Sequence, residues 1–183
     1  WYDWNVFAMS ESTTLGGFVE DLIVQLPEYG QLTYGDLPQV ESLADAYGKL
    51  TDGQRQSVSG AVYEQMSEAV SLLIGPLNDK VEDIQTRIVD LPVPVTLDDR
   101  GEIVSIRQAC DELPGTYQVK VANIEVLEAA EVHMVELLID GLPSAGEIIL
   151  SDREAVEEAG NAYKALSSGQ QAEVGNYNEL LAA

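Results

Sequence analysis

Cysteine and histidine are almost absent from this chain. Among 183 residues, Cys110 is the single cysteine and His133 the single histidine. One cysteine excludes an internal disulfide, and it fits both the cytosol and bacterial surface proteins that fold without bridges. Because zinc sites draw on several Cys or His ligands, a lone histidine disfavours a transition-metal site. We therefore expect no metal and no cofactor.

Basic residues are also scarce. Nine Lys and Arg face 32 Asp and Glu, so the formal net charge is −23 at pH 7. A nucleic acid backbone or an anionic membrane surface would repel such a chain, which disfavours both as partners. The charge favours solubility and leaves multivalent cations as weak partners. No Asp-x-Asp-x-Asp-Gly loop occurs, which excludes a high-affinity EF-hand.

Long hydrophobic runs are missing as well. Leu72-Leu73-Ile74 ends at Gly75-Pro76, and Glu136 interrupts the apolar stretch that begins at Val135. Neither run approaches the roughly 20 residues that span a bilayer, so we expect no membrane insertion. There is no starting Met and no signal-like stretch. We interpret the sequence as a fragment of a longer protein.

A repeated pattern is present instead. Leu-Pro pairs begin at Leu26, Leu91 and Leu142, and we call these occurrences copies one, two and three. Each has an isoleucine three residues earlier and a β-branched residue seven earlier, a spacing typical of the buried face of a helix that ends at the proline. These residues are Val19 and Ile23, Ile84 and Ile88, and Val135 and Ile139.

A second helix is predicted in each copy, after an extended connector and an aspartate. The aspartates are Asp36, Asp99 and Asp152. Registered on Val40, Ile103 and Val156 as position 0, apolar residues at +3, +7 and +10 form one buried stripe. The aligned residues are Leu43, Ile106 and Ala159 at +3; Ala46, Ala109 and Ala162 at +6; Tyr47, Cys110 and Tyr163 at +7; Leu50, Leu113 and Leu166 at +10; and Val58, Val121 and Val174 at +18.

The junction after this helix is also repeated. Thr51 with Gln54 and Ser167 with Gln170 predict capping boxes, whereas Pro114-Gly115 requires another turn in copy two. A further amphipathic helix follows, with Ile124, Leu127, Val132, Val135 and Leu138 in copy two. Copy one carries about twelve extra residues around Gly75–Asn78, which we interpret as a break between two helices.

These patterns predict an all-α fold of tandem short helical bundles in an elongated repeat arrangement. An N-terminal helix, or the remnant of a preceding domain, is expected over residues 1–18. Copy one covers 19–90 with its insertion near 70–80, copy two covers 91–141, and a truncated copy three covers 142–183. The sequence leaves open whether the connectors pair as short strands.

The copies resemble a known family. The motifs are Leu97-Asp98-Asp99, Ala46-Tyr47 to Leu50, Ala162-Tyr163 to Leu166, Thr51 to Gln54, and Val174 to Tyr177. They are similar to the tandem three-helix, FIVAR-like repeats of large extracellular proteins of Gram-positive bacteria. The resemblance covers roughly residues 19–183. It implies a secreted or cell-wall-associated setting, often beside adhesin or carbohydrate-active domains, and it carries over no catalytic residues.

Residues that often carry chemistry have structural interpretations here. Cys110 aligns with Tyr47 and Tyr163, so its position belongs to the core, and a base such as His133 lies on another helix. His133 is interpreted as a partly exposed helix residue. No carboxylate pair stands out for glycoside hydrolysis, because 32 acids produce neighbours by chance. These neighbours are Asp98-Asp99, Asp111-Glu112, Glu128 with Glu131, and Glu157-Glu158.

Aromatic residues gather before copy one. Trp1, Tyr2, Trp4 and Phe7 are either packing residues of a capping helix or preceding domain, or a surface that stacks on a sugar or docks a protein. We favour packing and keep Trp1 and Trp4 as candidate ligand contacts.

We therefore expect a non-catalytic spacer or interaction module of a secreted or cell-surface bacterial protein. One alternative is an adhesin module that holds a host or bacterial surface protein or glycan, at Trp1 and Trp4 or near Gly75-Pro76. The other is an accessory region of an extracellular glycan-active enzyme.

Overall fold

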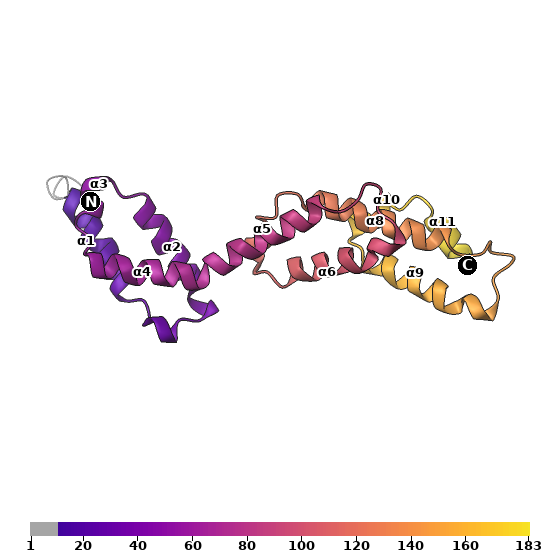
Figure 1. The fold of residues 1–183 in the computed structure, drawn as a ribbon, viewed down its shortest axis with the longest axis horizontal. Coiled ribbons are helices and arrows are strands. Elements are labelled where there is room, and N and C mark those ends of the chain that lie inside the picture. Colours follow the sequence, from indigo (N-terminus) through magenta and orange to yellow (C-terminus); the bar gives the residue numbers. More distant parts are fainter. Residues whose placement is uncertain (1–10) are drawn as a thin grey trace, which may run out of the picture. The chain divides into compact units, whose positions relative to one another are not determined.

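The computed structural model describes residues 11–183, with side chains from Leu15 onward. This part of the chain is all-helical and contains no strand (Figure 1). The all-α class predicted from the sequence is therefore confirmed. The chain divides into two compact units, one up to Asp79 and the other from Lys80.

Within the described residues, no helix is both long and apolar enough to cross a membrane.

The first unit packs three helices together. They are α1 (Glu11–Val24), α2 (Leu37–Gly48) and α4 (Gly60–Leu73), each in contact with the other two, while the short α3 (Asp52–Arg55) lies against α1. Gly16 permits that close approach, because a Cβ there would overlap the Ser57 side chain and the Gln54 carbonyl. The buried residues include Val19, Ile23, Val40, Leu43, Leu50, Val58, Met66 and Leu73.

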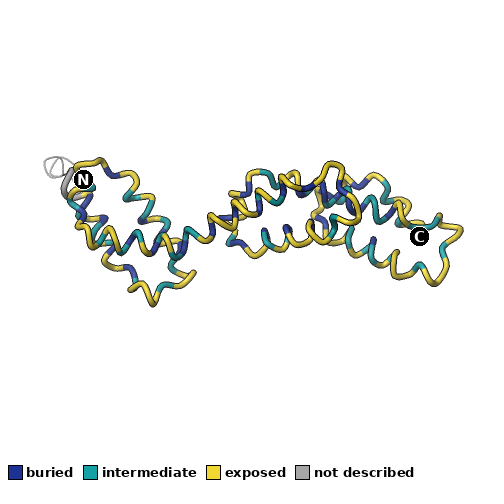
Figure 2. The backbone as a smooth tube through the Cα atoms, viewed as in Figure 1, coloured by how far each residue is buried: buried dark blue, intermediate teal, exposed yellow. Residues whose placement is uncertain are grey.

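The second unit is organised around α8 (Ile124–Asp140). This helix contacts α6 (Arg100–Asp111) before it in the chain and α9 (Arg153–Ala165), α10 (Ser168–Glu173) and α11 (Tyr177–Ala182) after it. The unit also contains most of α5 (Gly75–Val89) and the short α7 (Gly115–Gln118). Leu127 and Ile139 of α8 are fully buried, and Figure 2 shows the buried positions along the chain.

The helix ends predicted at the Leu-Pro pairs are confirmed. Helices α1, α5 and α8 each end two residues before the leucine. The β-branched residues seven and three positions earlier are all buried. Of the second-helix stripe, positions +3 and +10 are buried in all three copies. At +7, Cys110 is buried but Tyr47 and Tyr163 are only half-buried, and so is Val156 at position 0. Less covers it, because α9 packs on α8 and on the six-residue α11.

The aspartates before the second helices act one turn earlier than a simple N-cap would. Asp36, Asp99 and Asp152 each fold back and accept a hydrogen bond from the backbone N–H three residues before, at 2.7–2.9 Å. They close the 3-10 turns Tyr34–Asp36 (η3), Leu97–Asp99 (η4) and Leu150–Asp152 (η5). The connectors predicted as extended therefore end in 3-10 turns, and none forms a strand in the described part of the chain.

The predicted capping boxes are confirmed. Thr51 and Gln54 open α3, and Ser167 and Gln170 open α10, each pair exchanging side-chain and backbone bonds. Copy two differs as expected, since Pro114 precedes α7 and its carbonyl accepts from Tyr117 N–H at 2.7 Å.

The insertion in copy one is helical. Only Ile74 separates α4 from α5, so two helices stand where copy two has the single α8. The interruption between the two helices lies at Ile74, whereas Gly75–Asn78 forms the start of α5. Helix α1 runs through residue 18 and α5 begins before residue 80. The copy boundaries at 18/19, 90/91 and 141/142 stay predictions.

Candidate functional site

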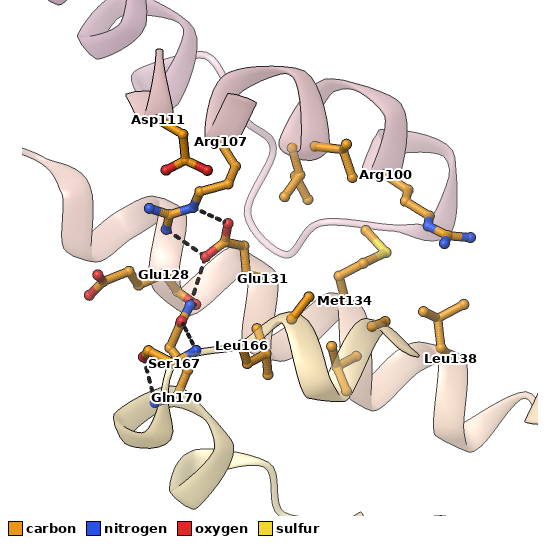
Figure 3. Close-up of a pocket in the computed structure, with 15 residues that line it drawn as sticks. Arg100, Arg107, Asp111, Glu128, Glu131, Met134, Leu138, Leu166, Ser167 and Gln170 are labelled. Carbon is orange, nitrogen blue, oxygen red and sulfur yellow. Dashed lines mark hydrogen bonds and ion pairs between the residues drawn. The ribbon is translucent and has the colours of Figure 1, made fainter. Parts of the chain in front are cut away.

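A groove of about 630 Å³ runs along α8 in the second unit. Its walls come from α6 on one side and from α9 and α10 on the other (Figure 3). The floor is apolar and includes Met134, Val135 and Leu138, while charged residues stand along the α6 side. Arg100, Ile103 and Arg107 share one face of α6 because they are spaced three and four residues apart.

Arg107 and Glu131 form a two-pronged ion pair across the groove. The Arg107 Nε and Nη2 atoms donate to the Glu131 Oε1 and Oε2 atoms at 2.6 and 2.7 Å. Only 13% of the Glu131 side chain is exposed. The hydrogen bond to Glu131 raises the pKa of the Arg107 guanidinium, although burial opposes this shift. The Arg107 guanidinium therefore stays protonated throughout the physiological pH range.

Gln170 completes this network from α10. Its Nε2 donates to Glu131 Oε2 at 2.7 Å and to the Glu128 carbonyl at 3.3 Å. Its Oε1 accepts from Ser167 N–H at 3.0 Å, so one side chain both caps α10 and ties it to α8. Figure 3 shows Arg107 and Gln170 turned toward Glu131 from opposite walls.

Sequence reasoning found the Ser167–Gln170 pair but missed Glu131 and Arg107. A signal for Arg107 was present, because it follows Ile106 on the apolar face of its helix. Arg100 makes an ion pair with Glu158 of α9 at the other end of the groove. Both arginines of the groove are thus engaged by carboxylates, and the surface left for a ligand is mainly its aliphatic floor.

A second, smaller hollow of about 420 Å³ lies between α8 and the connector after α5. It is lined mostly by aliphatic and proline side chains from Leu91 to Val95, with Ala130 and His133 of α8 opposite. His133 is partly exposed, as predicted, and its Nδ1 lies 3.6 Å from Glu136 Oε2. The histidine is thus a lining residue with one carboxylate neighbour.

Cys110 occupies the core position that its alignment with two tyrosines predicts. It lies on α6 and is 3% exposed. Burial raises the pKa of its thiol, and the nearby Arg107 offsets the shift only in part. A raised pKa disfavours the thiolate, which is the form that a nucleophile requires.

The neighbouring carboxylates serve different partners. Asp99 closes a 3-10 turn, Glu131 binds Arg107, and Glu158 pairs with Arg100. Glu157 pairs with Arg153 within α9. No group of three or more potential metal ligands occurs among residues of the described region.

The candidate ligand contacts Trp1 and Trp4 lie outside the described residues, as do Tyr2 and Phe7. The other predicted place for a ligand, Gly75-Pro76, forms the first turn of α5.

Comparison with known proteins adds no relative. No family model, no curated protein and no solved structure matches this chain.

Proposed function

We propose that this chain is a non-catalytic scaffold, a tandem array of three-helix units that serves as a spacer or interaction module of a secreted or cell-surface bacterial protein. The observation that carries the proposal is the recurrence of contacts between helices at matching positions of the copies.

The first recurrence involves the residue six positions before each Leu-Pro leucine. Glu20 Oε1 accepts from Ser59 N–H at 3.2 Å, and Glu136 Oε1 accepts from Gly175 N–H at 2.9 Å. In copy two, Gln85 Nε2 donates to the Lys120 carbonyl at 3.2 Å. Each bond ties the first helix to the chain beside the +18 valine. Three bonds at one register support a common unit.

The second recurrence involves the residue five positions after the +10 leucine. Arg55 donates to the Gly48 carbonyl at 2.7 Å. Gln118 donates to the carbonyls of Asp111 and Leu113, and Gln171 to those of Tyr163 and Leu166. All three side chains satisfy carbonyls at the end of the second helix, which lack partners within the helix itself.

The third recurrence concerns the +7 position. Tyr47 packs its ring on Tyr63 with centroids 5.2 Å apart, and Tyr163 stacks on Tyr177 at 4.1 Å. Both pairs join the second helix to the third. Copy two has Cys110 in this place, which supports its interpretation as a substituted core residue.

Copies two and three share one helix. Helix α8 follows α7 as the third helix of copy two, and it precedes the third Leu-Pro pair as the first helix of copy three. Here each three-helix unit is counted from the helix that precedes its Leu-Pro pair. The first unit therefore uses α4 as its third helix, and α5, which precedes Leu91, is the first helix of the second unit. Each unit then buries its apolar face against neighbouring helices, which is how repeat proteins build a continuous core.

The secreted or surface setting rests on the resemblance to extracellular tandem repeats and on the acidic surface. An antibody against the chain should label intact cells of its source, and labelling confined to permeabilised cells would contradict this setting.

The scaffold proposal is tested by matched substitutions at the −3 isoleucines. Ile23→Ala, Ile88→Ala and Ile139→Ala should each lower stability by about 2–5 kcal/mol, because all three are fully buried. In each variant, the rate of hydrogen exchange should increase mainly in the helices that pack on the substituted isoleucine. Equivalent losses support a common unit, whereas a cost confined to one copy, or hydrolysis of glycans or peptides by the purified chain, would contradict it.

A second candidate function is protein binding at the groove on α8, which its aliphatic floor favours. No aromatic side chain lines the groove, so it offers no ring for a sugar to stack on. Val104 is exposed at its edge, and the exposed Val119 is not part of its lining. Val104→Lys should abolish binding in a peptide-library screen while Val119→Lys leaves it unchanged. Equal effects would remove the groove as the site.

A further inference from the structure

Helix α1 carries an exposed apolar stripe. Leu15 is 49% exposed, Phe18 is 59% exposed, and Leu22 is half-buried. The spacing of three and four residues places them along one face, beside the buried face of Val19 and Ile23. Exposed apolar side chains that lie next to one another on a helix form a candidate contact surface for another element.

Two of the three equivalent positions are covered in α8, and the third is half-buried as in α1. Counted back from the Leu-Pro leucine, Leu22, Phe18 and Leu15 stand at −4, −8 and −11, where α8 has Leu138, Met134 and Glu131. Met134 is only 5% exposed, and Figure 3 shows it pointing toward α6. Glu131 is held by Arg107 of α6. In α8, the −8 and −11 positions therefore face α6, the second helix before it, while Leu138 at −4 also packs against the cluster that contains Ile139 and Ala159.

Helix α5 provides the contrast. Its −4, −8 and −11 residues are Arg87, Asp83 and Lys80, all charged. Lys80 and Asp83 are exposed. The Arg87 Nε atom lies 2.7 Å from the Glu102 Oε1 atom of α6, the helix that follows α5. Helix α5 follows α4 and is not also a third helix. Helix α8, which belongs to two units, thus has apolar residues at −4 and −8. Helix α5, which belongs to one unit, has charged residues there.

From this difference we infer that the Leu15–Phe18–Leu22 face of α1 is the docking surface for the second helix of a further three-helix unit, the equivalent of α6. The inference rests on the proposed tandem array. The partner is an amphipathic helix with aliphatic residues at the positions of Ile103 and Ile106. It needs no arginine at the position of Arg107, because α1 has Leu15 where α8 has Glu131.

The register of the chain supplies a partner of known sequence. Tyr177, which opens α11, aligns with Ile124, which opens α8, and Val24 aligns with Asp140, where α8 ends. Joining Ala182 of one copy of the chain to Thr14 of another therefore gives a single helix from Tyr177 through Val24 with the 17-residue length of α8. The second helix facing Phe18 would then be α9 of the first copy.

The test compares the single chain with this tandem protein by hydrogen exchange. In the tandem protein, the backbone amides of α9 and α11 in the first of the two joined chains should exchange at least about tenfold more slowly than in the single chain. Phe18→Lys at the junction should cancel the gain. In the single chain, Phe18→Lys should leave protection unchanged, whereas the matched Met134→Lys, at the covered position of α8, should reduce protection of α6 and α9.

Any of three results would overturn the inference. One is a tandem protein whose junction helices gain no protection while both copies stay folded. Another is a single chain in which Phe18→Lys is as damaging as Met134→Lys, since the face would then already be covered. Dimers of the single chain that protect α1 alone would also overturn it, by assigning the face to an α1–α1 contact. The three matched isoleucine substitutions test the array without using this face, so the inference can fail while the array stands.

Discussion

At the scale of single residues, the polar side of the groove on α8 is held together by contacts among a few side chains. Arg107, Glu131 and Gln170 come from three helices, and both Arg107 and Gln170 donate to the Glu131 carboxylate. The sequence predicts the part of this network that is local, the Ser167–Gln170 capping box. It does not predict the Arg107–Glu131 pair, because 24 residues separate the two and their meeting depends on how α6 crosses α8.

Arg107→Met should lower the free energy of unfolding by about 3 kcal/mol, because it leaves the mostly buried Glu131 charge with Gln170 as its remaining donor. Urea denaturation measures the loss. The control is Arg153→Met, which removes an exposed pair with Glu157 and should cost less than about 0.5 kcal/mol. Equal costs for the two variants would show that burial of the Arg107 pair contributes nothing.

Alkaline pH should weaken the fold through Cys110. Burial raises the thiol pKa above its ordinary value of 9.0, so the folded state keeps a proton that the unfolded chain has lost. Stability from this group is complete below the unfolded pKa and is lost as the pH rises through the folded pKa. Above about pH 9, the wild-type chain should therefore lose stability faster than Cys110→Ala, by up to about 1.4 kcal/mol per pH unit. Parallel pH profiles in urea denaturation would rule this out.

Helices are the scale at which the sequence predicts most. Their ends follow from local chemistry, since proline stops a helix and Ser or Thr with Gln starts one, and these signals need no tertiary contact. The connectors were harder to predict, because Val93–Leu97 is β-rich by composition. Its Thr96–Asp99 bonds nevertheless close a 3-10 turn, with no neighbouring strand to pair with in the described residues.

Thr51→Ala should destabilise the first unit by about 1 kcal/mol, because Thr51 Oγ1 accepts from Gln54 N–H and also contacts the Gln54 side chain at the start of α3. Thr116→Ala is the matched control, since Thr116 is exposed in α7 and makes no comparable cap. Thermal denaturation of both variants measures the difference. A Thr51→Ala chain as stable as the control would mean that α3 needs no cap.

The charge of the whole molecule opposes its folding. A net charge of −23 on 183 residues repels itself most in the compact state.

The division of the chain into two units, between Asp79 and Lys80, was not predicted from the sequence. It falls within α5, whose start the sequence marks only by Gly75-Pro76.

Added salt should therefore stabilise the chain. Raising NaCl from about 0.05 M to 0.5 M shortens the screening length to less than half and should raise Tm by several degrees. KCl should act equally, because the effect is screening rather than binding of one ion. A fall in Tm would mean that ion pairs such as Arg107–Glu131 outweigh the general repulsion.

Helix α8 has a consequence for how such a gene can grow. Because α8 contacts α6 on one side of the chain and α9 on the other, one further unit requires only a helix pair and not a whole bundle. Duplicating the coding segment for Ala122–Val174 would add a second helix, a short helix and a long helix in frame with both neighbours. Lengthening by such segments is a smaller evolutionary step than acquiring a new domain.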